Sequence, residues 1–244
     1  MTLEQAEALD AADPLASYRA QFMCPAGVIY LDGNSLGQLP LATVQAGAEA
    51  VTQAWGERLI RGWNEGWIDA PQRVGAMIAP LIGAAPDEVI SADSTSVNLY
   101  KLIVAALRLD PKRNVVVSEA GNFPTDLHIA EGAVAAVAGA ELRVVERGAL
   151  ADALGDDTAL LLLTHVHYKT TERFDMAAWT KAAHDAGALV CWDLSHSAGA
   201  VAVGLNAAAI DGDTDDLTRN QLVMRFRNNS DEPMILCNYG VLTT

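Results

Sequence analysis

The sequence predicts an α/β fold built around a mainly parallel sheet, and three observations lead to that prediction. From residue 88 onward, strand-like and helix-like segments alternate, which is the pattern of strands joined by helical crossovers. The strand-like segments are apolar on both faces, as expected of strands that helices cover on both sides. The segment 188–193 ends in a carboxylate, Asp193, at the edge where open α/β sheets place their ligands.

The elements before residue 88 are predicted to be mainly helical, and those after it to alternate. In order, we expect a helical arm at 3–22, a strand at 28–32, a turn at 33–37, and helices at 41–60 and 70–82 with a loop at 61–67 between them. Further strands are expected at 88–92, 114–118, 142–146, 159–164 and 188–193, and helices at 95–109, 125–138, 149–154 and 176–186.

The composition indicates a folded, acidic protein. The chain has 244 residues, of which 51% are hydrophobic, enough to bury a large α/β core. Its net charge of −15 offers no basic stripe to nucleic acid or an anionic membrane, and no apolar run is long enough to span a bilayer. Three cysteines are too few and too scattered for a metal site or a disulfide framework, which favours a cytoplasmic protein. His165 and His167 lack a third ligand, so no metal is expected.

Two polar clusters open helices just after predicted strands. Ser94, Thr95 and Ser96 begin the helix at 95–109, where hydroxyls and free N–H groups either bind phosphate or simply cap the helix. Residues 122–126 begin the next helix with a proline, which is common at helix starts, and with Phe123, an aromatic side chain that could stack on a flat ring.

Asp193 and His196 form a third cluster, at the end of the last predicted strand. A fixed carboxylate can keep the ring nitrogen of pyridoxal phosphate protonated, so that the ring acts as an electron sink, although Asp193 could equally cap a turn. That chemistry also needs a lysine to hold the cofactor as a Schiff base. The sequence contains four lysines, all before Asp193: Lys101, Lys112, Lys169 and Lys181.

Six segments share the order of a known family over residues 1–209. They are YLDGNSLG at 30–37, WG with RGW at 55–63, STSVNL at 94–99, NFPTDL at 122–127, LTHVHYKT at 163–170 and WDLSHSAGA at 192–200. Together they resemble kynureninase, a fold-type-I enzyme that uses pyridoxal phosphate. The resemblance implies the large domain of such a transferase, incomplete here. It also implies a homodimer and the hydrolysis of L-kynurenine or 3-hydroxykynurenine to anthranilate or 3-hydroxyanthranilate and L-alanine, in tryptophan catabolism and NAD biosynthesis.

The resemblance also implies roles for individual residues. It places Thr95 and Ser96 on the phosphate. It places Phe123 on the pyridine ring, at the start of a cofactor-binding run that continues with Pro124, Thr125 and Asp126. It also places Thr164 beside the ring, Asp193 on the ring nitrogen, and His196 next to Asp193. It places Ser35 and Trp63 in the substrate pocket.

After residue 209 the sequence departs from the family pattern, which continues with a run that supplies the Schiff-base lysine. We therefore expect three regions: an N-terminal arm and first strand at 1–40, a partial cofactor-binding large domain at 41–210, and a non-matching tail at 211–244 that is frameshifted or disordered. With its catalytic set incomplete, the chain is expected to be inactive alone. Two alternatives stay open: another fold-type-I enzyme, such as a cysteine desulfurase or a class V aminotransferase relative, and a non-catalytic fragment.

Overall fold

A computed structural model describes residues 1–203 and 234–236. The described chain divides into two units, the first comprising Met1–Asp69 and the second beginning at Ala70. Most of the tail expected at 211–244 lies outside the described residues. Within the part that is described, no helix is long and apolar enough to cross a membrane.

The first unit is helical. Its elements are α1 (Leu3–Ala12), η1 (Ala16–Gln21), α2 (Leu41–Glu49), the π-helical η2 (Ala50–Glu57) and η3 (Leu59–Glu65). The helical arm is confirmed, whereas the strand expected at 28–32 is wrong. That segment is irregular because its apolar side chains find no partner strand, and Ile29 and Leu31 are each 88% exposed. The turn at Gly33 follows as expected, but part of the loop predicted at 61–67 is helical in η3.

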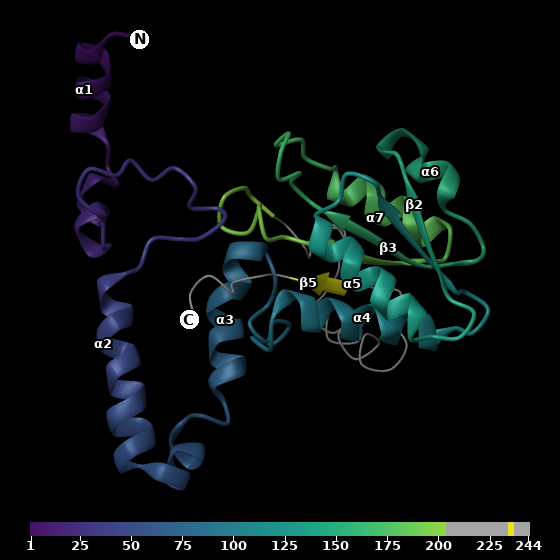
Figure 1. Ribbon diagram of the computed structural model, residues 1–244, viewed down its shortest axis with the longest axis horizontal. Helices are drawn as coiled ribbons and strands as arrows, with labels where there is room; N and C mark the ends of the chain where they lie inside the picture. Colours follow the sequence, from purple (N-terminus) through teal and green to yellow (C-terminus); the bar gives the residue numbers. More distant parts are fainter. Residues whose placement is uncertain (204–233, 237–244) are drawn as a thin grey trace. The chain divides into compact units, whose positions relative to one another are not determined.

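The second unit is built on a sheet of five parallel strands (Figure 1). In chain order its elements are α3 (Ala70–Ile82), α4 (Thr95–Leu109), β1 (Val115–Glu119), α5 (Pro124–Ala135), β2 (Glu141–Val145), η4 (Arg147–Ala149), α6 (Leu150–Ala153), β3 (Thr158–Thr164), α7 (Met176–Asp185), β4 (Leu189–Asp193) and β5 (Met234–Leu236). The strand order is β2-β1-β3-β4-β5, so the predicted α/β class with a mainly parallel sheet is confirmed.

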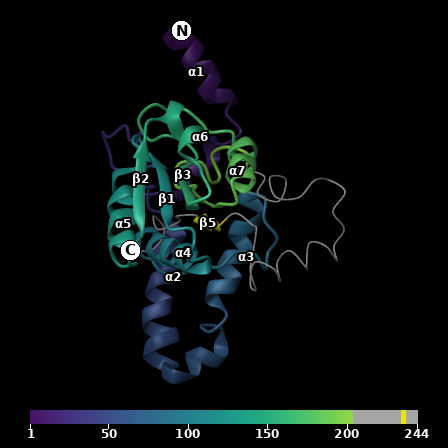
Figure 2. The ribbon, with the colours of Figure 1, turned by 90° about the vertical axis from the view of Figure 1, so that its right-hand side faces the viewer.

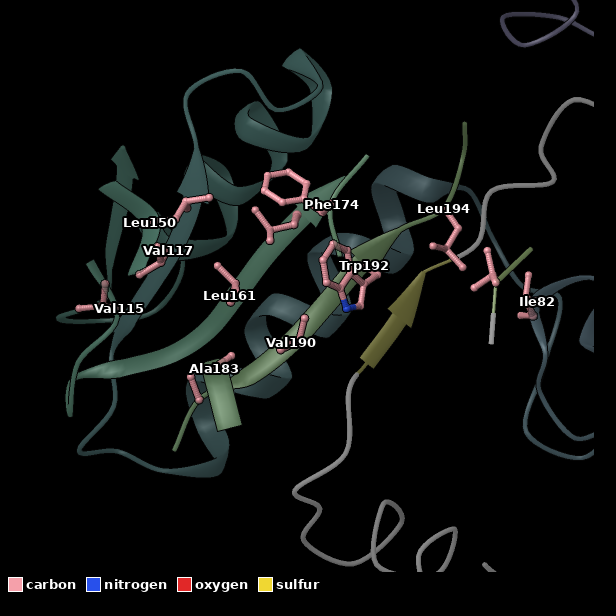
Figure 3. Packing of buried hydrophobic residues seen from close by; sticks show 13 residues of the cluster. Ile82, Val115, Val117, Leu150, Leu161, Phe174, Ala183, Val190, Trp192 and Leu194 are labelled. Atoms are coloured by element: carbon pink, nitrogen blue, oxygen red, sulfur yellow. The ribbon is translucent and has the colours of Figure 1, made fainter. Parts of the chain in front are cut away.

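Helices cover both faces of this sheet. Successive residues of each strand point to opposite sides, so both faces carry apolar side chains that the helices bury. On one face, alternate residues of β1, β3 and β4 pack with side chains of α6 and α7, as Figure 3 shows for Leu150, Ala183 and Trp192. On the other face, the intervening strand residues pack against α4 and α5. Figure 2 shows α5 and α7 on opposite sides of the strands. Strand β3 is buried along its whole length, which accounts for its continuous run of leucines.

The strand expected at 88–92 is also wrong. This segment is irregular and packs against α3 instead of joining the sheet. The Ser91 N–H donates to the Pro71 carbonyl at 3.1 Å. A side chain at Gly75 would place its Cβ 1.9 Å from the Val89 carbonyl oxygen, so the helix and the segment touch backbone to backbone.

Candidate functional site

The register of the sheet brings two of the predicted site residues together. Thr164 ends β3 and pairs with Asp193, which ends β4. The Thr164 Oγ1 lies 3.4 Å from Asp193 Oδ2 and 3.5 Å from Asp126 Oδ2, and it also contacts Asn122 Oδ1. Since a hydroxyl carries one proton, it can donate to only one of these three acceptors at a time.

Asp126 and Asp193, hereafter the acid pair, are both buried, with 2% of each residue exposed. Burial, together with the neighbouring Asp193 carboxylate, raises the pKa of Asp126 from its usual 3.8 to about 7. Two buried carboxylates beside one another cannot both be ionised without a large penalty unless a proton or a cation lies between or beside them. The acid pair is therefore a place that favours positive charge.

The remaining oxygen of Asp193 holds a turn. Its Oδ1 accepts a hydrogen bond from the Ser195 N–H at 2.8 Å and a second from the Ser195 hydroxyl. The turn-capping interpretation of Asp193 is thus correct for Oδ1, while Oδ2 faces Thr164. The two hydrogen bonds at Oδ1 fix the orientation of this carboxylate, and Oδ2 stays within reach of the Thr164 hydroxyl.

A chain of buried polar groups supports Thr164 from the side of β1. Asn122 Nδ2 donates to Ser118 Oγ at 3.0 Å, and Ser118 Oγ donates to the Leu162 carbonyl at 2.8 Å. The Phe123 N–H donates to Asn122 Oδ1 at 2.7 Å, which ties the start of α5 to the same network. The sequence placed Asn122 in the polar cluster at 122–126 without assigning it a role, and Ser118 was not selected. The signal was available, because both are polar residues at or just beyond the end of an apolar strand.

Three rings gather close to the start of α5, and we call Phe123, Tyr168 and His196 the aromatic cluster. The ring of Phe123 lies 5.0 Å from that of Tyr168 and 5.7 Å from that of His196, measured between centroids. His196 Nδ1 is buried without a hydrogen-bond partner in the described chain. Phe123 and His196 were predicted site residues, whereas Tyr168 was not selected.

Helix α4 begins with the hydroxyl cluster that the sequence singled out. Ser94 caps the helix, its Oγ accepting a hydrogen bond from the Val97 N–H at 3.3 Å, so the capping interpretation holds for Ser94. Thr95 and Ser96 are half-buried in the first turn. The Thr95 hydroxyl is buried without a hydrogen-bond partner among the described residues, next to N–H groups at the start of a 15-residue helix. A hydroxyl in this position suits an anionic group.

The other predicted residues lie in more exposed positions. Pro124 and Thr125 are exposed in the first turn of α5, where Pro124 occupies a usual place for proline. Ser35 donates a hydrogen bond from its hydroxyl to Asp32 Oδ1 at 2.8 Å, within the first unit. Trp63, in the same unit, is 51% exposed and packs edge-on against Trp67.

The site residues of the second unit fit a flat aromatic cation that carries an anionic group. The acid pair favours a protonated ring nitrogen, the aromatic cluster offers a face for stacking, and the Thr95 hydroxyl lacks a partner. Histidine, cysteine and carboxylate side chains do not assemble into a metal site in the part of the chain that the structure describes.

None of the four lysines, all of them within the described residues, forms an ion pair with Asp126 or Asp193. Lys101 pairs with Asp93, Lys181 pairs with Asp185 at 2.6 Å, and Lys112 is exposed. Lys169 is also exposed, and its Nζ lies 5.2 Å from the centre of the Tyr168 ring.

Comparison with known proteins gives the family. The family model described as aminotransferase class-V matches residues 29–212. Kynureninase of Burkholderia mallei (strain SAVP1) is 53% identical over 218 residues, covering 86% of this chain and 52% of that protein. Kynureninase of Pseudomonas fluorescens is 50% identical over 211 residues, covering 84% and 51%. The chain thus spans about half the length of the curated relatives that it matches.

Solved structures with the same fold are more distant in sequence. The cysteine desulfurase CsdA from Escherichia coli is 20% identical with a TM-score of 0.65, covering 82% of this chain and 53% of that one. A variant of C-DES with glycine covalently linked to its PLP cofactor is 19% identical with a TM-score of 0.66, covering 79% and 53%. These likenesses support the fold alone. Because the family model matches well over half of its residues, the chain belongs to the class-V aminotransferase family.

Proposed function

We propose that this chain carries the cofactor-binding part of a kynureninase, which hydrolyses L-kynurenine, or its 3-hydroxy form, to anthranilate or 3-hydroxyanthranilate and L-alanine. The observation that carries the proposal is its identity of 50–53% to kynureninases of two bacterial genera, over more than four-fifths of the chain. The solved cysteine desulfurase is far less similar at 20% identity, so we favour kynureninase over that alternative.

The proposed cofactor is pyridoxal phosphate, which when bound supplies an electron sink for cleavage of a bond in the substrate. Thr95 and Ser96 would hold the phosphate, and the unpartnered Thr95 hydroxyl supports this assignment. Phe123 would cover a face of the ring, within the run that also includes Pro124 and Thr125. His196 would lie beside the ring, since its own ring already packs close to Phe123.

The acid pair would hold the ring nitrogen in its protonated form. Asp193 is oriented for this by Ser195 at one oxygen, and its other oxygen stays within reach of the Thr164 hydroxyl. Asp126, with its pKa raised to about 7, would retain a proton in the absence of a cation and give up that proton when the ring brings a positive charge. Thr164 would turn its single proton toward whichever carboxylate is ionised.

The finer features of the family enter as part of the same proposal. Ser35 and Trp63 would line the substrate pocket, the assembled enzyme would be a cytoplasmic homodimer, and the chain would divide into regions 1–40, 41–210 and 211–244.

All four lysines of the sequence precede Asp193, and Lys169, the one beside the aromatic cluster, is exposed. We therefore propose that the chain binds the cofactor without a covalent bond and does not turn over kynurenine alone.

A chimera tests this function directly. Residues 1–209 are joined to the matching second half of the Burkholderia mallei kynureninase, and anthranilate formation from kynurenine is followed by fluorescence. We expect turnover by the chimera and none by the 244-residue chain. Asp193→Ala in the chimera should lower turnover by about 100-fold or more, because charge stabilisation at a buried ring is lost.

The same chimera separates the alternatives. A chimera that is inert toward kynurenine but releases sulfur from cysteine would favour the desulfurase interpretation. Equilibrium dialysis of the 244-residue chain with pyridoxal phosphate tests binding by itself, and Asp193→Ala should weaken it. A chain with no affinity for the cofactor would favour the non-catalytic fragment.

A further inference from the structure

The loop 165–174, which follows β3, carries Tyr168 into the aromatic cluster. We call it the β3 loop. Its two legs are joined by backbone hydrogen bonds: the His167 N–H donates to the Glu172 carbonyl at 2.9 Å, and the Phe174 N–H donates to the His165 carbonyl at 3.0 Å. Whatever fixes the returning leg, 172–174, therefore also fixes the outgoing leg that holds Tyr168.

Arg147, just after β2, contacts the returning leg at two points. Its Nη1 donates to Glu172 Oε2 at 3.3 Å, and its guanidinium carbon lies 4.0 Å from the centre of the Phe174 ring. Phe174 also packs in the core, with its ring centroid 5.8 Å from that of Trp179 and 6.2 Å from that of Trp192. Figure 3 shows Phe174 and Trp192 in this cluster. Phe174 is thus held between the core and a cation.

Arg147 is itself held by the sheet. Its Nε donates to Glu119 Oε1 at 2.7 Å and its Nη2 donates to Glu119 Oε2 at 3.3 Å, a two-point contact with a carboxylate whose side chain is only 9% exposed. Glu119 is the last residue of β1, a fully buried strand that is paired on both sides in the sheet. The planar guanidinium uses separate donors for the two carboxylates while its face covers the ring, which an ammonium group cannot do.

We propose that Arg147 is a positioning residue that anchors the β3 loop to the end of β1 and so fixes Tyr168 against Phe123 and His196. The significance for cofactor binding rests on the proposed function, because Phe123 and His196 are the residues proposed to contact the ring. The anchoring itself depends only on the contacts of Arg147 with Glu119, Glu172 and Phe174. Arg147 acts through the loop and touches none of the groups proposed to hold the cofactor.

A pair of arginine variants tests the anchor. Arg147→Lys keeps the charge but loses the forked geometry, and Arg143→Lys is its matched control. Arg143 lies on the same strand-and-turn segment, is 29% exposed where Arg147 is 31% exposed, and donates to Asp157 Oδ2 at 2.9 Å away from the β3 loop. Amide hydrogen exchange is measured at His167 and Phe174 in the 244-residue chain without ligand.

We expect Arg147→Lys to speed exchange at both amides by about tenfold, because weakening a charge-assisted hydrogen bond lowers the protection of the loop by about that factor. Arg143→Lys should leave the exchange rates unchanged. Nuclear Overhauser contacts between the Phe123 and Tyr168 rings should weaken in the first variant only. Should Arg147→Lys fail to fold, Glu172→Ala removes the loop-side contact of Arg147 together with the hydrogen bond that the Thr170 hydroxyl donates to Glu172 Oε2 at 3.2 Å. It should still speed exchange at His167, and by more than Thr170→Val, which removes the second of these bonds but keeps the Arg147 contact. Equal exchange in the folded variants and the wild type would overturn the anchor.

Cofactor binding is the separate readout. In the wild-type chain and the variants, affinity for pyridoxal phosphate is measured by equilibrium dialysis. We expect Arg147→Lys to weaken binding several-fold and Arg143→Lys to leave it unchanged. Faster exchange with unchanged affinity would refute the link between the loop and the ring. A wild-type chain that does not bind the cofactor would refute the proposed function, while the exchange data would still decide the anchor.

Discussion

Asp126 and Asp193 bring two buried carboxylates to one threonine hydroxyl, an arrangement that costs free energy unless positive charge is present. Within the described part of the second unit, Arg147, Arg143 and Lys181 form ion pairs with other carboxylates, those of Glu119, Asp157 and Asp185. The acid pair thus lowers the free energy of unfolding relative to uncharged side chains at the same positions, and residues that lower stability in this way are expected at functional sites.

The first prediction concerns the pH dependence of this pair. The pKa of Asp126 is raised on folding, so the folded chain binds the proton more tightly than the unfolded chain. Between about pH 4 and pH 7 the folded state thus holds more protons, and the contribution of Asp126 to the free energy of unfolding falls as pH rises. Asp126→Asn removes this dependence. The stability gained by the variant over wild type should therefore be larger near pH 8 than near pH 5 in urea unfolding; a gain that is equal at both pH values would contradict it.

The second prediction concerns Thr164. Thr164→Val keeps the shape of the side chain but removes the hydroxyl that lies between Asn122, Asp126 and Asp193. Because buried acceptors are then left without their donor, we expect the free energy of unfolding to fall by about 1–3 kcal/mol. The control is Thr125→Val, an exposed threonine of α5, which should change stability by less than about 0.5 kcal/mol. Equal effects of the two variants on urea midpoints would show that the network carries little stability.

Elements with a buried, two-sided apolar pattern were predictable from the sequence. Strands β1, β3 and β4 are of this kind. Together with β2, an edge strand whose residues are exposed or half-buried, they fall within a residue of their expected bounds, and α4 matches its expected range. The two strands that failed, at 28–32 and 88–92, have the local composition of strands, but a strand needs a partner, and pairing is decided by residues far away in the sequence. In the second case the neighbour is α3, whose Gly75 lets the backbone of Val89 approach closely.

The third prediction tests that contact between α3 and the 88–92 segment. Gly75→Ala would place a Cβ 1.9 Å from the Val89 carbonyl oxygen and 2.9 Å from the Ile90 nitrogen, and backbone cannot move aside as a flexible side chain can. We expect a loss of about 1–3 kcal/mol, as for other overpacked sites. Gly132→Ala in α5 is the matched control. Its Cβ would meet nothing within 4 Å, so removal of a helical glycine should stabilise the chain by up to about 1 kcal/mol. Thermal unfolding of both variants gives the comparison, and a neutral Gly75→Ala would contradict the packing described.

At the scale of the whole molecule, the site was only partly predictable because its contacts are non-local. Thr164 meets Asn122 across 42 residues of sequence and Asp193 across 29. Thr164 and Asp193 could be selected because each ends a predicted strand, and parallel strands end at the same edge of a sheet. The same rule could have led to Ser118 and Arg147, at or just after predicted strand ends, but not to Tyr168, and it does not tell which of these residues support the site. Their importance comes from which side chains face them in the folded chain, and the sequence alone does not reveal that.

The last prediction concerns association of the chain with itself. The helices α1, η1, α2 and η2 contain no buried residue, and large apolar side chains in the first unit remain exposed, among them Trp55 at 64% and Ile60 at 76%. Exposed apolar surface of this kind favours association, whereas a net charge of −15 opposes it by repulsion between copies.

Salt screens this repulsion but leaves the apolar attraction in place, so we expect sedimentation velocity to show association that grows with protein concentration and with added salt. Replacing Trp55 and Ile60 together by glutamine should shift the distribution toward the monomer. Replacing exposed residues of the second unit, Val144 and Leu109, in the same way should shift it less, because the described part of that unit exposes fewer large apolar side chains than the first unit does. A monomer at all concentrations and salt levels would show that the charge outweighs the apolar surface.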